Sequence, residues 1–328
     1  MDDLRRLVNG YQVSQAIHVA ATLGIADLLK DGPRASDDLA DATNTHAPTL
    51  YRLLRALAAV GILDEDDDRR FALAPLGEEL RRDHPQSLHG WATFVGRPYV
   101  WNAWAHLIDS VRTGKTAFRL ANGIDIWSYR AANPEESVIF DAAMRSVTKT
   151  IDRALLAGYD FSRFRTVVDV GGGNGTLLAS LLAEYPNMRG VLFDQPHVVA
   201  GATDVLEGVS DRSRVESGSF FEAVPGGGDA YVLKAIIHDW DDDDALRILG
   251  VIRQAVPDRA VLLVLERVVG APNEDVATKF GDLTMLVAPG GRERTIDEFA
   301  ALFTAAGFEL ESVTDTDAGI SVLEAVPA

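Results

Sequence analysis

The pattern of apolar positions changes character near residue 165. Before it, apolar residues recur every three or four positions, the spacing of an amphipathic helix, through residues 11–30 and again over 50–60. Ser36 provides an N-cap signature for a short helix between these two stretches. The pattern over residues 62–80 then predicts two short strands joined by a charged turn. This order of helix, helix and hairpin predicts a winged-helix-like module.

After residue 165, β-branched runs alternate with helical segments. Strands are predicted near 166–170, 190–194, 213–217, 229–235 and 260–267. This alternation predicts a parallel sheet with helices on both faces. The last two apolar runs, 308–316 and 319–327, predict an antiparallel pair that closes the sheet.

The chain is therefore expected to be an α/β protein with an additional helical domain at its N-terminus. Its 328 residues are enough for a large core and for more than one domain. We expect residues 1–95 to form the winged-helix-like module and residues 96–155 to form a helical linker rich in aromatic side chains. Residues 156–328 would form the α/β domain.

A glycine cluster follows the first predicted strand of the α/β domain. Glycines stand at positions 171, 172, 173 and 175, and Asp169 stands two residues before the first of them. Glycine lets a backbone approach a ligand where a Cβ atom would collide. The dinucleotide fingerprint G-x-G-x-x-G does not fit, because Thr176 and Leu178 stand where its third glycine would be. The spacing D-x-G-x-G-x-G is similar instead to the first motif of S-adenosylmethionine (SAM)-dependent methyltransferases.

An acidic residue also stands where a nucleoside would need one. Asp194 ends the second predicted strand of the α/β domain, the position from which a carboxylate accepts hydrogen bonds from ribose hydroxyls in βαβ units. The glycine cluster and Asp194 together indicate a nucleoside-containing cofactor.

Charge and composition exclude several classes of function. The net charge of −18 argues against binding to nucleic acid, which requires a basic footprint. The helix over 50–60 offers only Arg52 and Arg55 to a DNA groove. The module is therefore expected to bury the helices of residues 11–60 against a second copy of the chain, as a homodimer. The chain has no cysteine and no apolar run of membrane-spanning length, so a cytoplasmic location is the default.

Several motifs make the chain resemble a known enzyme family. It is similar to the small-molecule O-methyltransferases of the caffeate, acetylserotonin and aromatic-polyketide tailoring type. The resemblance is carried by VVDVGGGNGTLL, FDQP, GSFFEAVP, YVLKAIIHDWDDDDALRIL, LLVLERV and PGGRERTIDEFAALFTAAGF.

The resemblance implies both a fold and an activity. The fold would be a class I SAM-methyltransferase domain, Rossmann-like with one antiparallel strand, joined to a winged-helix dimerisation domain. The activity would be methylation of a hydroxyl on an aromatic small molecule in natural-product biosynthesis. The cofactor would be SAM, and the product would be S-adenosylhomocysteine.

The resemblance also assigns residues. It places His238 as the general base and Glu266 and Glu293 as the acids that flank it. Ser219 stands where the family usually has an aspartate beside adenine, so the usual hydrogen bond to the adenine amino group is in question. The cofactor residues are Asp169, Gly171, Gly173, Asp194, Gln195, Ser219, Phe220 and Lys234, and those on the substrate side are Trp101, Phe140, Met144 and Asp239.

The chemistry requires a base whatever the family. A phenol has a pKa of about 10, so most of it is protonated at neutral pH. A histidine within hydrogen-bond reach can remove that proton as the oxygen attacks. His238 follows a buried strand, where open α/β sheets bind ligands, and a carboxylate at its other ring nitrogen would fix the tautomer. No set of His, Asp and Glu shows metal-ligand spacing, so no metal is expected.

Alternative interpretations remain for these residues and for the function. Asp239 or Asp241 could cap a helix over 244–254, and Glu293 could begin a helix over 297–306. The chain could also be a family member with a non-methylating or N-methylating activity. A winged-helix transcriptional regulator is the third possibility.

Overall fold

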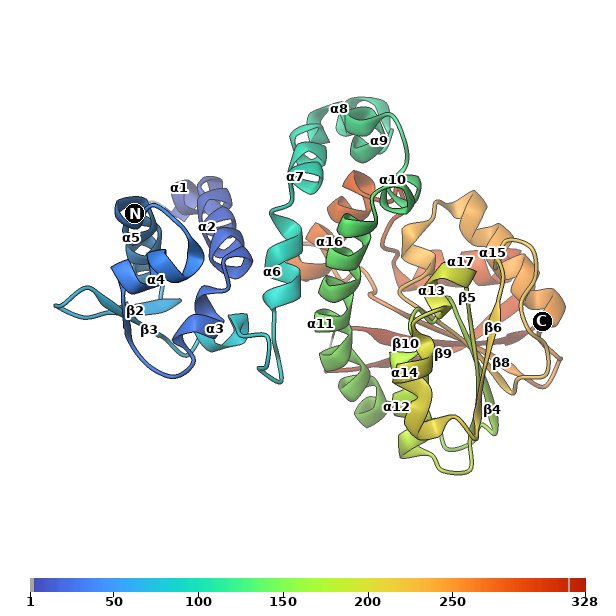
Figure 1. Cartoon of the computed structure of the whole chain (residues 1–328). Helices are drawn as coiled ribbons and strands as arrows, with labels where there is room; N and C mark the ends of the chain where they lie inside the picture. Colours follow the sequence, from blue (N-terminus) through green and yellow to red (C-terminus); the bar gives the residue numbers. More distant parts are fainter. Residues whose placement is uncertain (1–2, 318) are drawn as a thin grey trace. The chain divides into compact units, whose positions relative to one another are not determined.

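The chain divides into two compact units. The computed structural model describes residues 3–317 and 319–328, except for the side chains of residues 149 and 150. One unit is helical and contains Met1–His106 and Ala121–Thr150; the other contains Leu107–Leu120 and Ile151–Ala328. Figure 1 follows both along the chain, from the blue N-terminal helices to the red C-terminal strands.

The helical unit has the predicted order of helices followed by a hairpin. Its three short strands form an antiparallel sheet of order β1-β3-β2. Its core contains Leu39, Leu54 and Phe71, all fully buried. Its elements are α1 (Asp3–Val8), α2 (Gly10–Thr22), α3 (Ile25–Leu29), β1 (Arg34–Ala35), α4 (Ser36–Thr43), α5 (Ala47–Ala59), β2 (Leu63–Glu65), β3 (Arg70–Leu73), η1 (Gly77–Leu80), α6 (His89–Val95), α7 (Pro98–Ala105), α10 (Ile126–Ala132) and the first part of α11 (Pro134–Gly158).

Two local predictions in this unit need correction. The helical pattern over residues 11–30 is divided into α2 and α3, because Gly24 adopts a left-handed conformation with φ of 67°. Ser36 is the first residue inside α4, and Ala35 is the N-cap, without a side-chain capping bond. Short breaks of this kind do not disturb an apolar periodicity, so the pattern alone does not reveal them.

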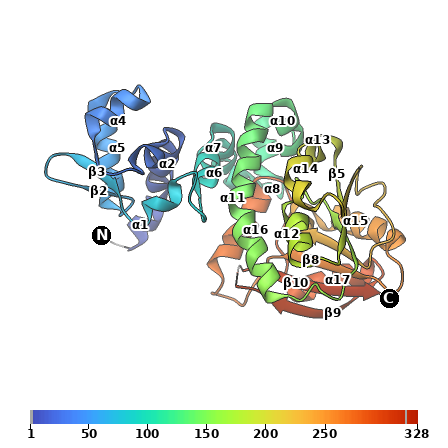
Figure 2. The ribbon, with the colours of Figure 1, turned by 60° about the horizontal axis from the view of Figure 1, so that its bottom comes forward.

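The α/β unit contains one seven-stranded sheet, of order β6-β5-β4-β7-β8-β10-β9. Strands β4 to β8 pair in parallel, whereas β10 is antiparallel to both of its neighbours, which confirms the predicted closing pair (Figure 2). The elements of this unit are α8 (Leu107–Thr113), most of α9 (Ala117–Asn122), the end of α11, β4 (Thr166–Val170), α12 (Thr176–Glu184), β5 (Arg189–Asp194), α13 (Pro196–Val199), α14 (Ala202–Leu206), η2 (Glu207–Val209), β6 (Ser213–Ser217), β7 (Ala230–Lys234), η3 (Ile237–Asp239), α15 (Asp242–Ala255), β8 (Val261–Glu266), α16 (Val276–Val287), α17 (Ile296–Ala305), β9 (Phe308–Asp315) and β10 (Ser321–Pro327).

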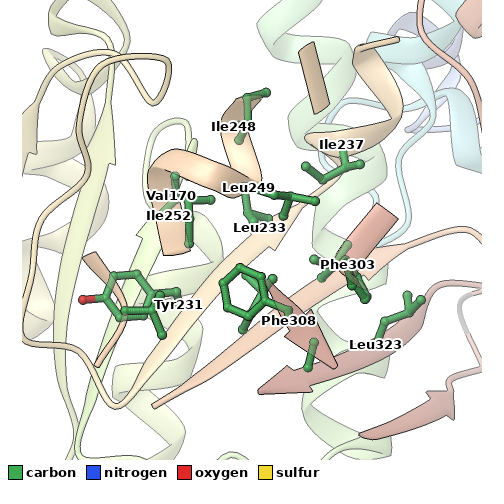
Figure 3. Packing of buried hydrophobic residues seen from close by; sticks show 14 of the residues in the cluster. Val170, Tyr231, Leu233, Ile237, Ile248, Leu249, Ile252, Phe303, Phe308 and Leu323 are labelled. Atoms are coloured by element: carbon green, nitrogen blue, oxygen red, sulfur yellow. The ribbon is translucent and has the colours of Figure 1, made fainter. Parts of the chain in front are cut away.

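Helices cover both faces of the sheet. Figure 3 shows one face, where Ile248 and Ile252 of α15 and Phe303 of α17 pack against strand residues such as Leu233. The other face packs against α12, α14 and the end of α11. Strands β4, β5, β7 and β8 are therefore buried on both sides, as their continuous apolar runs predict, whereas β6 is an edge strand without a buried residue.

The strand order places a switch point at the centre of the sheet. From β4 the chain passes to β5 and β6 on one side, and it then returns to β7 and β8 on the other. Ligands bind at the carboxyl ends of the strands at such a point. In the part of the chain that the structure describes, no helix has both the length and the apolar character that crossing a membrane requires.

Candidate active site

The glycine cluster turns sharply between β4 and α12. Gly171 has φ of 71°, and a Cβ atom there would lie 2.6 Å from Cδ1 of Ile236. The backbone N–H of Gly173 donates to Oδ2 of Asp194 at 2.9 Å, and that of Gln195 donates to Oδ1 at 2.6 Å. Burial raises the pKa of Asp194, and these two N–H donors oppose the rise. Asp194 therefore joins the end of β5 to the glycine loop.

Residues after β6 lie against the same loop. A Cβ atom on Gly171 would lie 3.5 Å from Cε1 of Phe220, whose ring packs edge-on against Trp240 with centroids 6.0 Å apart. Ser219 Oγ accepts a hydrogen bond from the N–H of Phe221 at 3.3 Å. Ser219 thus stabilises the turn that presents Phe220, a role that the sequence does not reveal.

Buried charges lie beneath the loop. Asp169 is 1% exposed, and its Oδ2 has no hydrogen-bond partner among the described residues. Burial raises the pKa of Asp169 to about 7, against the opposing charge of Lys234. Lys234 Nζ donates to Asp152 Oδ1 at 2.5 Å. Asp152, on α11, was not predicted, although it stands three residues before the buried Leu155 and so on the apolar face of its helix.

The turn after β7 is built on a carboxylate from β8. Oε1 of Glu266 accepts the backbone N–H of Ile236 at 3.0 Å, of Ile237 at 2.8 Å and of His238 at 3.3 Å. Ala235, which begins the turn, has a left-handed φ of 54°. A left-handed conformation is strained for a residue with a side chain, and the three bonds offset that strain. Glu266 therefore shapes the backbone that carries His238.

The imidazole of His238 is held between acids. Nδ1 lies 3.2 Å from Glu293 Oε1 and 3.3 Å from Glu266 Oε2, whereas Nε2 lies 3.7 Å from Asp239 Oδ1. The side chain of His238 is 16% exposed, and those of Glu266 and Glu293 are 1% and 2% exposed. A carboxylate accepts hydrogen bonds and cannot donate one, so Nδ1 carries a proton and Nε2 is the nitrogen that can accept one.

This environment changes the proton affinity of the ring. Burial by itself lowers the pKa of His238, but the charge of Glu266, the hydrogen bond to Glu293 and the charges of Asp239 and Glu293 raise it to about 10. Burial also raises the pKa of Glu266 to about 7, although the positive charge of His238 opposes this. The cluster therefore stabilises the protonated form of the His238 ring, the imidazolium.

The same three side chains come close enough together to be considered as a metal site. One ligand atom each from His238, Glu266 and Glu293 lies within 4.8 Å of the others, a proximity that sequence spacing does not reveal. Glu266 Oε1, however, already accepts three backbone N–H groups. We interpret the group as a hydrogen-bonded base with its two acids.

The observed helix caps show which of the acidic residues begin helices. Asp241 caps α15, since its Oδ1 accepts the N–H of Asp244 at 2.9 Å. Helix α17 begins with a capping box between Thr295 and Glu298, so Glu293 does not begin it.

The predicted substrate residues belong to the helical unit, except for Asp239. Trp101 lies on α7, and Phe140 and Met144 lie one turn apart on α11, all half-buried. The ring of Phe140 packs edge-on against Phe94, with centroids 5.5 Å apart, and the guanidinium carbon of Arg130 lies 3.3 Å from its centroid. Phe140 therefore packs with Phe94 and Arg130 inside the helical unit.

Known proteins resemble this chain over nearly its whole length. The model of an O-methyltransferase domain matches residues 104–309, and that of an O-methyltransferase dimerisation domain matches residues 5–83. Phenazine O-methyltransferase PhzM of Lysobacter antibioticus is 42% identical over 99% of this chain and 95% of its own length. The 8-amino-8-demethylriboflavin N,N-dimethyltransferase of Streptomyces davaonensis is 40% identical over 92% of this chain and 88% of its own length.

A solved structure of an O-methyltransferase also matches this chain. The crystal structure of NcsB1, an O-methyltransferase from neocarzinostatin biosynthesis in complex with SAM and 2-hydroxy-5-methyl naphthoic acid, matches with a TM-score of 0.83 at 33% identity. The match covers 96% of each chain.

Proposed function

Because this chain belongs to the O-methyltransferase family with an N-terminal dimerisation domain, and is a SAM-dependent O-methyltransferase, we propose that it methylates a hydroxyl of an aromatic small molecule with His238 as the general base. One observation carries the proposal. Nδ1 of His238 faces two buried carboxylates, which leaves Nε2 as the proton acceptor.

The residues at the switch point fit the cofactor. Asp194 can accept hydrogen bonds from the ribose, and Gly173 beside it has open space where a Cβ atom would stand. Asp169, a buried acid with an oxygen that lacks a partner among the described residues, suits a cationic ligand. Gln195, Ser219, Phe220 and Lys234 complete the proposed set at the ends of neighbouring strands. When bound, SAM supplies an electrophilic methyl group.

The histidine cluster provides the proton transfer. The acceptor oxygen forms the new O–C bond as the S–C bond breaks, and its proton passes to Nε2 of His238. Glu266 and Glu293 stabilise the imidazolium that results, because their carboxylates lie within 3.3 Å of Nδ1. No metal is part of this mechanism.

The acceptor is proposed to be aromatic on the evidence of relatives and of side chains. NcsB1 was crystallised with a naphthoic acid, and PhzM is a phenazine O-methyltransferase. Trp101, Phe140 and Met144 would offer flat apolar surface to such a ring, and Asp239 would contact its polar substituents.

A panel of phenols incubated with the enzyme and SAM tests this function. Mass spectrometry should detect a gain of one methyl group on at least one phenol, at the hydroxyl. One relative is an N,N-dimethyltransferase, so each phenol should be paired with its amino analogue. Methylation of the amines in preference to the phenols would establish N-methylation instead.

The pH dependence of the rate should reveal the acids around His238, which are Glu266, Glu293 and Asp239. They raise the pKa of His238 to about 10. The fraction of His238 that is neutral, and with it kcat, should therefore increase at pH values well above those at which an imidazole usually titrates. Glu293→Gln removes one charge, lowers that pKa and should move the rise to lower pH by about 1 unit or more.

The measurement is kcat against pH for both proteins on one phenol. Because the acceptor is the same, its own ionisation cannot cause the displacement. Glu311→Gln, an equal charge change on the exposed side of β9, should leave the profile in place. A profile of Glu293→Gln that stays in place or moves to higher pH would contradict the assignment.

We also propose that the enzyme is a homodimer. The dimerisation domain matches residues 5–83, and large apolar residues are exposed on α1 (Leu4, Leu7 and Val8) and at the start of α2 (Tyr11). Light scattering at micromolar concentration should give twice the chain mass of 35.5 kDa. Leu7→Asp combined with Tyr11→Asp should shift the mass toward that of one chain, whereas Val215→Asp on β6 should not. A single-chain mass for the unmodified protein would refute the dimer.

A further inference from the structure

The largest side chain that the structure buries completely is a charged one, Arg294. It is 1% exposed and follows Glu293 directly in the chain. A buried guanidinium is costly unless every N–H finds an acceptor. The acceptors of Arg294 therefore indicate what it does.

The guanidinium of Arg294 bonds to both sides of His238. Nη1 donates to the carbonyl oxygen of Ile237 at 3.1 Å, and Nη2 donates to that of Trp240 at 3.0 Å. Nε and Nη2 also donate to Oδ1 of Asp242, at 3.0 and 2.7 Å. One side chain thus ties the turn that carries His238 to the first turn of α15.

The backbone on the two sides of Glu293 is bonded to two different segments. The N–H of Arg292 donates to the carbonyl oxygen of His238 at 2.9 Å. A Cβ atom on Gly291 would lie 2.0 Å from that oxygen, so the two segments are in close contact. The N–H of Val269, just beyond β8, donates to the carbonyl oxygen of Arg294 at 2.9 Å. Arg294 therefore connects the three segments that supply His238, Glu266 and Glu293.

We propose that Arg294, with Asp242, is a positioning residue that holds His238 at the correct distance from Glu293 and Glu266. The inference rests on the proposed role of His238 as the base. Arg294 acts through the backbone, because its hydrogen bonds go to main-chain carbonyl oxygens and to Asp242. Its planar fork supplies donors in several directions at once, which a lysine ammonium on a flexible stem cannot reproduce.

The test compares Arg294→Lys and Asp242→Asn with the unmodified enzyme. Arg294→Lys keeps the charge but loses the fork, so kcat should fall by roughly 10–100-fold, the scale of a displacement of about 1 Å at a reacting group. SAM affinity measured by calorimetry should change by less than about threefold, because the fork bonds to the His238 turn and not to the glycine loop. Asp242 is 59% exposed, so Asp242→Asn should fold and give a smaller loss in the same direction.

The pH profile separates positioning from a purely structural role. Glu266, Glu293 and Asp239 are the acids that face His238. If Arg294 keeps the ring beside them, both variants should move the rise of kcat to lower pH. A loss of kcat that only follows the loss of folded protein, with the profile in place, would overturn the proposal.

Arg253 provides a matched control in the same unit. Its guanidinium also bonds to backbone carbonyl oxygens, of Gly307 at 3.0 Å and Val256 at 3.4 Å, at the far end of α15. Arg253→Lys should leave kcat and the pH profile unchanged. If Arg294→Lys does not fold, Asp242→Asn alone tests the proposal. A kcat and a pH profile of Asp242→Asn that equal those of the unmodified enzyme would then refute the positioning role. A His238→Ala variant with full activity would instead refute the base itself.

Discussion

Replacing His238 by alanine should lower kcat by roughly 10²–10⁴-fold, the usual contribution of a positioned general base. SAM affinity should barely change, since the side-chain contacts described for His238 are with Glu266, Glu293 and Asp239. The loss is expected to be larger than that of Glu293→Gln, because Glu293 orients the base and does not receive the proton.

The pH dependence of the variant should identify the missing step. At high pH, solvent ionises a phenol without help, so His238→Ala should recover part of its activity there. The measurement is kcat from neutral to alkaline pH on one accepted phenol, with SAM binding followed by calorimetry. His84→Ala, in the helical unit, is the control and should behave like the unmodified enzyme. Near-equal kcat in the pH range where kcat of the unmodified enzyme has risen would mean that proximity to the methyl group suffices, and the base assignment would be wrong.

The sequence predicted those features of the fold that depend on local patterns. Strands β4 and β5 lie where the continuous apolar runs placed them, because a strand buried on both faces needs such a run. The position of Asp194 at a strand end followed from the same pattern. The break at Gly24 was missed, since a single left-handed residue leaves the apolar spacing intact.

The sequence predicted less about how the site is held together. Glu266 was expected beside His238, but nothing local indicates that it accepts three backbone N–H groups from the turn after β7. Asp152 pairs with Lys234 across 82 positions, and Arg294 reaches Asp242 across 52. Such pairs depend on how distant segments meet, which a linear pattern of apolar and polar residues does not specify.

Replacing Asp194 by alanine should weaken SAM binding by about 1.5–3 kcal/mol, the scale of hydrogen bonds to a charged group. The carboxylate would accept hydrogen bonds from the ribose, and it already holds the N–H of Gly173 in the glycine loop.

The two roles of Asp194 can be separated by the choice of ligand and variant. If the ribose contact dominates, Asp194→Ala should weaken methylthioadenosine, which carries the ribose, about as much as SAM. Asp194→Asn keeps an oxygen that can accept the N–H of Gly173, so it should lose less affinity than Asp194→Ala. Asp204→Ala, an exposed acid on α14, should bind SAM normally. Calorimetry that finds unchanged SAM affinity in Asp194→Ala would remove Asp194 from the cofactor site, because neither the ribose contact nor the support of the loop could then contribute to binding.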